Sequence, residues 1–196
     1  MSTTSDPLGG TSGRVDFFDV VNERRSVRSY LPDMPGDDVI KKVLEAGMAA
    51  PSAGNRQPWE FIVVQKDREL KEAITNTTYR GNSWQNRQTQ AWLLEAPLLI
   101  IVCGVPQRCA SRYGWDHAQK LLLQDTAAAI ENMLLAATAL GLASCWVGGF
   151  DMVALTNLLH LPEFVPPLAI LPLGYASRPH ARPAKLEPDS LVRAWL

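Results

Sequence analysis

The sequence predicts an α+β fold. Helix-like segments and three or four short apolar strands follow one another in mixed order, which favours helices packed on a sheet over a regular β-α repeat. No Gly-x-Gly-x-x-Gly nucleotide turn follows any predicted strand. The chain has 196 residues, of which 46% are hydrophobic and 20% charged, a balance typical of a globular protein that buries a core. We expect one domain over residues 15–196, and a disordered tail over residues 1–14, which are rich in Ser, Thr, Gly and Pro.

The first half of the chain predicts three helices and one strand. Asp16 is placed to cap a short helix that delivers the first basic residues. Asp37 and its neighbour begin a second helix with one apolar face. Residues 59–65 are β-branched and aromatic, which favours a strand, and Asp67 then caps a charged helix.

Residues 76–95 are polar and amide-rich, with Tyr79, Trp84 and Trp92 set among Asn, Gln and Arg. We interpret this segment as a helical lid whose aromatic rings stack on a flat substrate. A solvated surface excursion is the alternative that the residues leave open.

The second half predicts three strands, at 97–105, 144–147 and 167–173. A loop that contains Tyr113 follows the first strand, and the longest helix follows over residues 118–140. This helix is rich in alanine, which permits close approach of another helix in a core or a subunit interface. A further helix, capped by Asp151, lies between the last two strands.

Three cysteines, with no Cys-x-x-Cys pair, fit a reducing cytoplasm. Cys103 and Cys145 lie in apolar runs and are expected to be buried thiols. Cys109 has Arg108 and Ser111 near it in sequence and is expected to be more exposed.

The composition excludes several classes of function. A net charge of −1 does not recruit nucleic acid or an anionic membrane. No apolar run approaches the roughly 18–20 residues that span a bilayer. The histidines His117, His160 and His180 lack metal-ligand spacing, and no serine or cysteine sits in a nucleophile elbow. We therefore predict no metal site and no catalytic side chain, and expect a cofactor to supply the reactivity.

Three guanidinium groups surround a hydroxyl at Arg24, Arg25, Ser26 and Arg28. Arginine binds phosphate bidentately, which lysine does not imitate. Arg28 would lie against N1 and the C2 carbonyl of a flavin ring and raise its potential. A solvated basic face is the alternative for an arginine triplet taken alone.

The loop after the second helix carries Pro51, Ser52 and Asn55. An amide side chain donates and accepts together, as the polar edge of a flavin requires. The alternative is a plain connecting turn. Later in the chain, Gly148 and Gly149 follow a short strand and permit close approach of the backbone to a ligand.

The order of these motifs resembles that of the FMN-dependent nitroreductase family. The motifs are Arg-Arg-Ser-Val-Arg-Ser-Tyr, Ala-Pro-Ser-Ala-Gly-Asn-Arg-Gln-Pro-Trp, Ala-Ala-Ile-Glu-Asn-Met-Leu-Leu, Gly-Leu-Ala-Ser-Cys-Trp-Val-Gly-Gly and Leu-Gly-Tyr before a basic tail. The sequence departs from the family pattern at Glu131, where glutamine is common, and at Ala176, where proline is common.

The resemblance implies a mixed, mostly antiparallel central sheet flanked by helices, in an intertwined homodimer with two FMN sites at the subunit interface. One protomer would supply the arginine cluster, Gly148 and Gly149, with Arg182 and Lys185 of the tail completing the phosphate site. Pro51, Ser52 and Asn55 would reach the same flavin from the partner. The Gly148 backbone N–H would point at flavin N5.

The resemblance also implies ping-pong hydride transfer. NADH or NADPH would reduce FMN at N5, and nitroaromatics, quinones or similar electron-poor small molecules would then be reduced in the same place. Alternatives with the same fold are dehalogenation, enone reduction or flavin destruction. A low-turnover flavin sensor or carrier, and a structural dimer without flavin, are alternatives from other classes. The sequence does not determine the acceptor or the nicotinamide preference.

Overall fold

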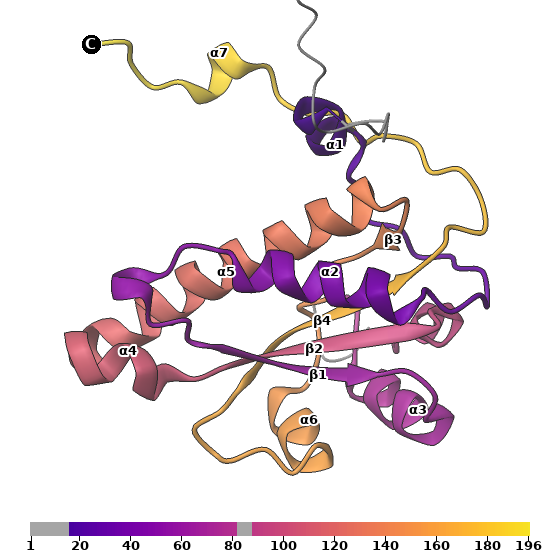
Figure 1. Ribbon diagram of the computed structural model, residues 1–196, viewed down its shortest axis with the longest axis horizontal. Helices are drawn as coiled ribbons and strands as arrows, with labels where there is room; N and C mark the ends of the chain where they lie inside the picture. The colour runs from indigo at the N-terminus through magenta and orange to yellow at the C-terminus, as the bar shows by residue number, and fades with distance from the viewer. Residues whose placement is uncertain (1–15, 82–87) are drawn as a thin grey trace, which may run out of the picture.

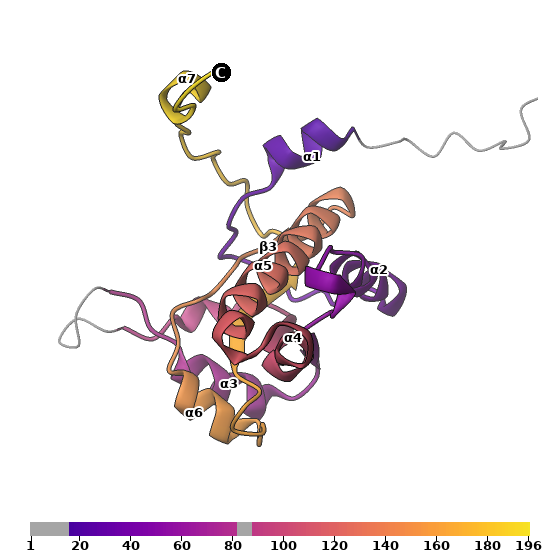
Figure 2. The ribbon, with the colours of Figure 1, turned by 90° about the vertical axis from the view of Figure 1, so that its left-hand side faces the viewer.

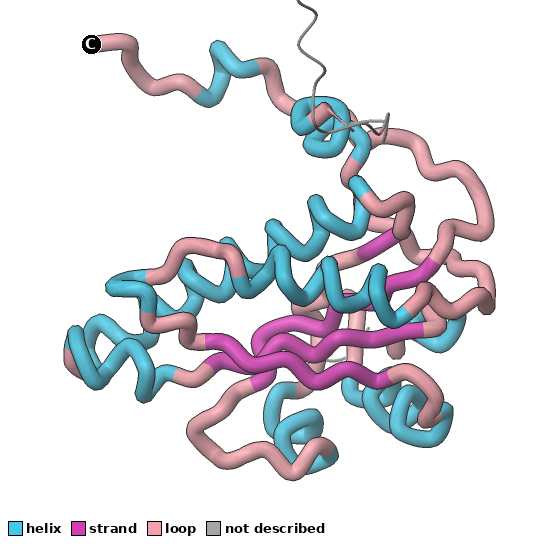
Figure 3. The backbone as a smooth tube through the Cα atoms, viewed as in Figure 1, coloured by secondary structure: helices cyan, strands magenta, loops and turns pink. Residues whose placement is uncertain are grey.

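The computed structural model describes residues 16–81 and 88–196. In this part of the chain a four-stranded sheet lies between two layers of helices (Figures 1 and 3). Its order is β1-β2-β4-β3, and all three pairs of neighbouring strands are antiparallel. An isolated parallel bridge joins Ser26 to Ser144. The α+β fold with a mixed, mostly antiparallel sheet is confirmed. The strands are β1 (Trp59–Val64), β2 (Leu98–Gly104), β3 (Ala143–Ser144) and β4 (Pro167–Gly174).

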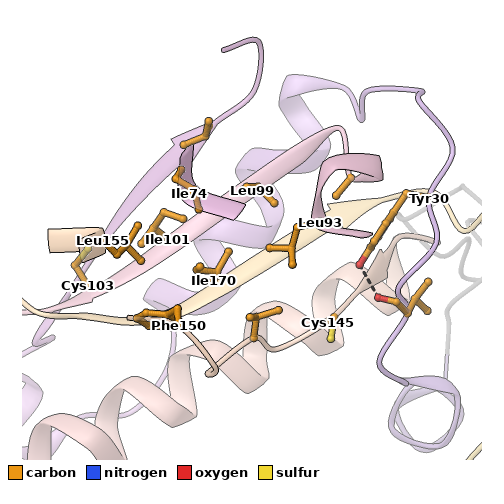
Figure 4. Packing of buried hydrophobic residues seen from close by; sticks show 14 of the residues in the cluster. Tyr30, Ile74, Leu93, Leu99, Ile101, Cys103, Cys145, Phe150, Leu155 and Ile170 are labelled. Carbon is orange, nitrogen blue, oxygen red and sulfur yellow. Dashed lines mark hydrogen bonds between the residues drawn. The ribbon is translucent and has the colours of Figure 1, made fainter. Parts of the chain in front are cut away.

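Strand β2 is buried along its whole length, and its alternating side chains divide the core into two clusters. Leu98 and Ile100 pack toward α2 (Asp37–Met48) and α5 (Trp115–Ala139). Leu99 and Ile101 face the other way, in a cluster with residues of α3 (Arg68–Thr77) and α6 (Met152–Leu158). Figure 4 shows Ile74 and Leu155 of these two helices close to Ile101. A strand covered on both faces needs apolar residues at every position, as this one has.

The helix caps expected from the sequence are confirmed. Asp16, Asp67 and Asp151 each accept a backbone N–H bond at the start of α1 (Phe17–Glu23), α3 and α6. These bonds satisfy N–H groups that have no partner within the helix. The same caps determine where each of these three helices begins.

The segment between β2 and α5 was expected to be a loop, and this prediction was wrong. It forms α4 (Pro106–Tyr113), with Pro106 in the first turn, where a missing N–H costs nothing. Cys109 is consequently fully buried rather than exposed, because the helix turns it toward the core. Burial raises the pKa of the Cys109 thiol.

The described part of residues 76–95 is not the helix that we expected. Arg80 and Gln88 pair their backbone groups in both directions, at 2.8 and 3.1 Å, and Thr78 bridges to Phe150. The short 3-10 helix η3 (Ala91–Glu95) follows. The segment forms extended backbone pairs rather than a helix because it is polar and has no continuous apolar face through which a helix could pack.

Two peripheral segments stand away from the body of the molecule. Figure 2 shows α1 and α7 (Pro188–Leu191) on one side, beyond the end of α5. Phe17 and Phe18 of α1 are 62% and 70% exposed and contact each other edge to face. Among the described helices, none is both long and apolar enough to cross a membrane.

Candidate functional site

The arginine cluster and the C-terminal segment line one cavity of about 690 Å³, which we call the basic cavity. Its positively charged side chains come from two stretches of chain more than 150 residues apart in sequence. Ser26 and Glu131 also line it. The positive side chains are Arg24, Arg25, Arg28, Arg182 and Lys185. The structure therefore brings together two groups of residues that the sequence analysis assigned to one phosphate site.

The extended backbone after α1 aims its side chains alternately inward and outward. Val27 is 6% exposed and belongs to the core, whereas Ser26 and Arg28 on either side of it are exposed. The Val27 N–H donates to the Ser144 carbonyl at 2.9 Å, which ties this segment to β3. Because side chains alternate along extended chain, burial of Val27 turns both neighbours toward the cavity.

Glu131 of α5 places one negative charge among these cations. Its Oε1 lies 3.4 Å from Arg24 Nε. Among the described residues that line the basic cavity, Glu131 is the one carboxylate. The contact orients Arg24, and the cavity keeps a strong excess of positive charge.

Arg25 contacts the backbone rather than extending freely into the cavity. Its Nε donates to the Glu23 carbonyl at 2.7 Å and its Nη1 to the His180 carbonyl at 2.6 Å. The His180 ring bonds in turn to the Arg178 carbonyl through Nδ1, at 2.8 Å, and lies 3.2 Å from Ser29 Oγ through Nε2. A carbonyl only accepts, so Nδ1 carries the proton. These bonds hold the C-terminal segment beside the cavity.

The C-terminal segment then delivers its two cations to the cavity. Arg182 Nη2 donates to Asn22 Oδ1 at 2.9 Å, and both Arg182 and Lys185 line the cavity wall. His180 and Asn22 were not singled out from the sequence as site residues. No local pattern marks them, because their contacts join residues about 150 positions apart.

Arg28 lies over an aromatic ring. Its guanidinium carbon is 5.8 Å from the centroid of the Trp92 ring, within the range of a cation–π contact. Trp92 is half-buried against the core cluster that contains Leu93 and Tyr30. The ring predicted to stack on a substrate thus contacts a predicted cofactor residue. Trp84 lies outside the described residues.

The thiol of Cys145 borders the same region. Burial raises its pKa, against the opposing effects of Arg28, Ser26 and Arg24. The thiol therefore stays protonated at neutral pH and adds no negative charge beside the cations.

The two glycines after β3 differ in their surroundings. A Cβ at Gly149 would lie 2.5 Å from the Tyr79 carbonyl oxygen, so only glycine lets these two backbones meet. The Tyr79 N–H donates to the Gly149 carbonyl at 2.8 Å. Gly148 is exposed, and a Cβ there would meet nothing within 4 Å. Gly149 serves chain packing, and Gly148 leaves its backbone open to a ligand.

Pro51, Ser52 and Asn55 do not line the basic cavity. Ser52 and Asn55 belong to a turn over residues 52–57 that includes the 3-10 helix η1 (Ala53–Asn55), and Pro51 directly precedes this turn. Pro51 and Asn55 are exposed. Ser52 Oγ accepts the Gln57 N–H at 2.9 Å, so this hydroxyl already braces the turn.

Comparison with known proteins identifies the family. Residues 21–175 match the family described as "Nitroreductase family". The chain belongs to the nitroreductase family. This membership confirms the resemblance seen in the sequence motifs, and the match covers the arginine cluster, the 52–57 turn and both glycines.

Individual relatives agree with this assignment. An Archaeoglobus fulgidus protein named "Putative NADH dehydrogenase/NAD(P)H nitroreductase" is 39% identical over 160 residues, covering 80% of this chain and 83% of that protein. A Bacillus subtilis protein named as an NAD(P)H FMN reductase is 26% identical, covering 87% and 70%. A Desulfovibrio desulfuricans structure in complex with FMN shares the fold, with a TM-score of 0.76, 23% identity and coverage of 98% and 99%.

Proposed function

We propose that this family member is an FMN-dependent NAD(P)H oxidoreductase that reduces small electron-poor acceptors. The single observation that carries the proposal is the basic cavity, where five cationic side chains face one carboxylate. A phosphate monoester carries about −1.5 to −2 charges near neutral pH, which such a cavity would compensate. The names of the relatives support FMN and NAD(P)H as cofactor and co-substrate.

The phosphate of FMN would be held by Arg24, Ser26, Arg182 and Lys185. Arginine supplies bidentate charge-assisted bonds and the serine hydroxyl a further donor. Arg25 would contribute mainly by holding the C-terminal segment, since its guanidinium already donates to two carbonyls.

The flavin ring would meet a cation and an open backbone in the same protomer. Arg28 would place its charge near N1 and the C2 carbonyl, and Gly148 would offer its N–H toward N5. When bound, FMN supplies hydride acceptance from NADH or NADPH and delivery of the reducing equivalents to an acceptor. The protein's part is to bind the flavin, orient it and set its electrostatics.

The second half of the site would come from a partner subunit. Asp125, which contacts the 52–57 turn, and Glu131, which lines the basic cavity, lie six residues apart on α5. This spacing places them on different faces of the helix. Pro51, Ser52 and Asn55 would therefore lie away from this protomer's basic cavity and complete the cavity of another copy. The exposed rings of Phe17 and Phe18 fit the same intertwined homodimer, in which a partner would cover them.

Acceptors of the nitroaromatic or quinone type fit a site whose chemistry depends on a flat ring stacked on flavin. Tyr79 lies near Gly149 and is a candidate to contact the acceptor. A cytoplasmic location would suit its three cysteines, which are free thiols, because that compartment keeps thiols reduced.

Anaerobic titration of the purified yellow protein with NADH and NADPH tests the proposal. Loss of the visible absorbance of oxidised flavin is expected with at least one nucleotide, followed by reoxidation with a quinone or a nitroaromatic. Halotyrosines, enones and excess free flavin serve as the other acceptors. Protein that binds no FMN, or bound flavin that neither nucleotide reduces, would contradict it.

A further inference from the structure

The 52–57 turn has a backbone that few sequences adopt without external support. Gly54, Asn55 and Gln57 have φ values of +56°, +54° and +46°. Left-handed conformations of this kind cost free energy for residues other than glycine. Such a turn persists only where surrounding contacts determine its shape.

Asp125 of α5 provides one of these contacts from outside the turn. Its Oδ2 accepts the Ala53 N–H at 3.0 Å, and the residue is only 8% exposed. Burial raises the pKa of this carboxyl, against the lowering effect of the Ala53 bond. Keeping an acid in this place opposes folding, so packing alone does not explain it.

A second polar side chain of α5 binds the chain just before the turn. Asn132 Nδ2 donates to the Ala46 carbonyl in α2, at 3.1 Å. Asn132 lies seven residues after Asp125, about two helical turns, and therefore on the same face. One face of α5 thus makes two separate contacts: Asp125 accepts the Ala53 N–H within the turn, and Asn132 donates to the Ala46 carbonyl in α2, outside the turn.

Helix α4 covers the other side of the turn. Arg56 donates to the Arg108 carbonyl at 2.9 Å and to Ser111 Oγ at 2.7 Å. Arg108 in turn donates to the Gln57 carbonyl at 2.8 Å. A Cβ at Gly54 would lie 2.7 Å from Tyr113 Oη. With these contacts on one side, the Asp125 bond determines the position of the turn on the other.

We propose that Asp125 is a positioning residue of the flavin site: it sets the 52–57 turn so that the Asn55 amide faces the polar edge of the flavin in a partner subunit. This inference rests on the proposed function, because it requires bound FMN. The bond to Ala53 acts two residues before Asn55, and the left-handed backbone transmits the position of residue 53 directly to that amide.

The test compares Asp125→Ala, Asp125→Asn and Asn132→Ala in the FMN-loaded protein. Asp125→Ala is expected to weaken FMN binding about tenfold, the effect of losing one well-placed hydrogen bond, and to shift the flavin midpoint potential. Asp125→Asn keeps an oxygen acceptor and should restore both values. Asn132→Ala, the matched control, removes an α5 contact outside the turn and should lower the melting temperature without changing FMN affinity or potential.

A backbone variant tests the same bond from the donor side. Ala53→Pro deletes the N–H, and the position accepts proline because it begins η1 and Ser52 before it is extended (φ −143°, ψ 153°). Its effect on FMN affinity should match that of Asp125→Ala, and the double variant should be no worse than either single variant. This variant also serves if Asp125→Ala does not fold.

Two outcomes overturn the inference. One is that Asp125→Ala and Ala53→Pro leave affinity and potential at wild-type values, as Asn132→Ala does. The other is that their effects simply add. Wild-type protein that binds no FMN would instead contradict the proposed function, so the two failures are distinguishable.

Discussion

The basic cavity and the 52–57 turn hold their polar groups in different ways. In the cavity, long side chains project from extended, unstrained segments, and one ion pair, two bonds to backbone carbonyls and one bond to the Asn22 side chain orient them. In the turn, the backbone is left-handed at three positions and is held by contacts from α4 and α5. The cavity has charged side chains that can adjust their positions, whereas the turn has a backbone of fixed conformation.

The difference follows from what each region would recognise. Coulomb attraction to a phosphate falls slowly with distance, so the cations tolerate imprecise placement. Hydrogen bonds to a ring edge weaken steeply when the angle is wrong, so an amide there needs a fixed backbone. A substitution should therefore be better tolerated in the basic cavity than in the 52–57 turn.

The largest effect is expected at Gly54. Gly54→Ala adds a Cβ at a φ of +56°, at 2.7 Å from Tyr113 Oη and 2.9 Å from Arg112 Nη1. We expect the free energy of unfolding to fall by about 2–4 kcal/mol, measured by urea denaturation. Gly141→Ala is the control, because its φ is +74° but nothing lies within 4 Å; it should cost only about 1 kcal/mol. Equal losses would mean that the turn is not crowded.

In the basic cavity the effect should fall on the ligand rather than on folding. Arg24→Ala removes one charge-assisted contact and is expected to weaken FMN binding by about 1.5–3 kcal/mol, seen by fluorescence titration, with little change in melting temperature. The salt dependence of binding should also decrease. Arg28→Ala should instead mainly lower the flavin midpoint potential. If neither variant changes affinity or potential, the assignment of the cavity is wrong.

A smaller effect of opposite sign is expected at Glu131. Glu131→Gln keeps a polar partner 3.4 Å from Arg24 but removes the negative charge. FMN should then bind about two- to fivefold more tightly at low salt, the range of a partly exposed charge contact. The gain should vanish at high ionic strength. Weaker binding would show that Glu131 matters by orienting Arg24 rather than by its charge.

A comparably small effect is expected at Trp92. Trp92→Leu removes the ring beside Arg28, a contact of about 0.5–1 kcal/mol, which corresponds to roughly 10–20 mV in a two-electron potential. Spectroelectrochemical titration measures this shift. In the Arg28→Ala background the same substitution should have no further effect. An unchanged potential together with a raised KM for the acceptor would restore Trp92 to the substrate role first predicted for it.

Sequence patterns predicted helices and strands well wherever the type of a single residue, or one apolar run, decides the local structure. The aspartates before α1, α3 and α6 cap those helices, and the apolar run of β2 forms the central strand. Helix α4 was missed because it is short and mostly polar, and its buried residues, Pro106 and Cys109, lie only three positions apart, a pattern too short to predict a helix. The polar 76–95 segment misled in the opposite direction, since we expected a helix although the segment has no continuous apolar face.

The candidate site likewise has some features that are visible in the sequence and others that depend on tertiary packing. Arginines near a serine, a proline-glycine loop and paired glycines are visible in sequence, because charge and backbone freedom are properties of single residues. The ion pair of Arg24 with Glu131, the His180 bonds and the Asp125 contact are not visible, since each joins residues far apart in the chain.

The sequence by itself determined the α+β class, the starts of α1, α2, α3 and α6, the family motifs and the residue types that can bind an anionic cofactor. Only the tertiary structure decided that the C-terminal cations share a cavity with the arginine cluster, that Trp92 contacts Arg28, and that the 52–57 turn is held by Asp125. The physical reason is the distance along the chain over which each effect acts. Capping, periodicity and charge act within a few residues, whereas a cavity or a braced turn exists only after distant segments have packed together.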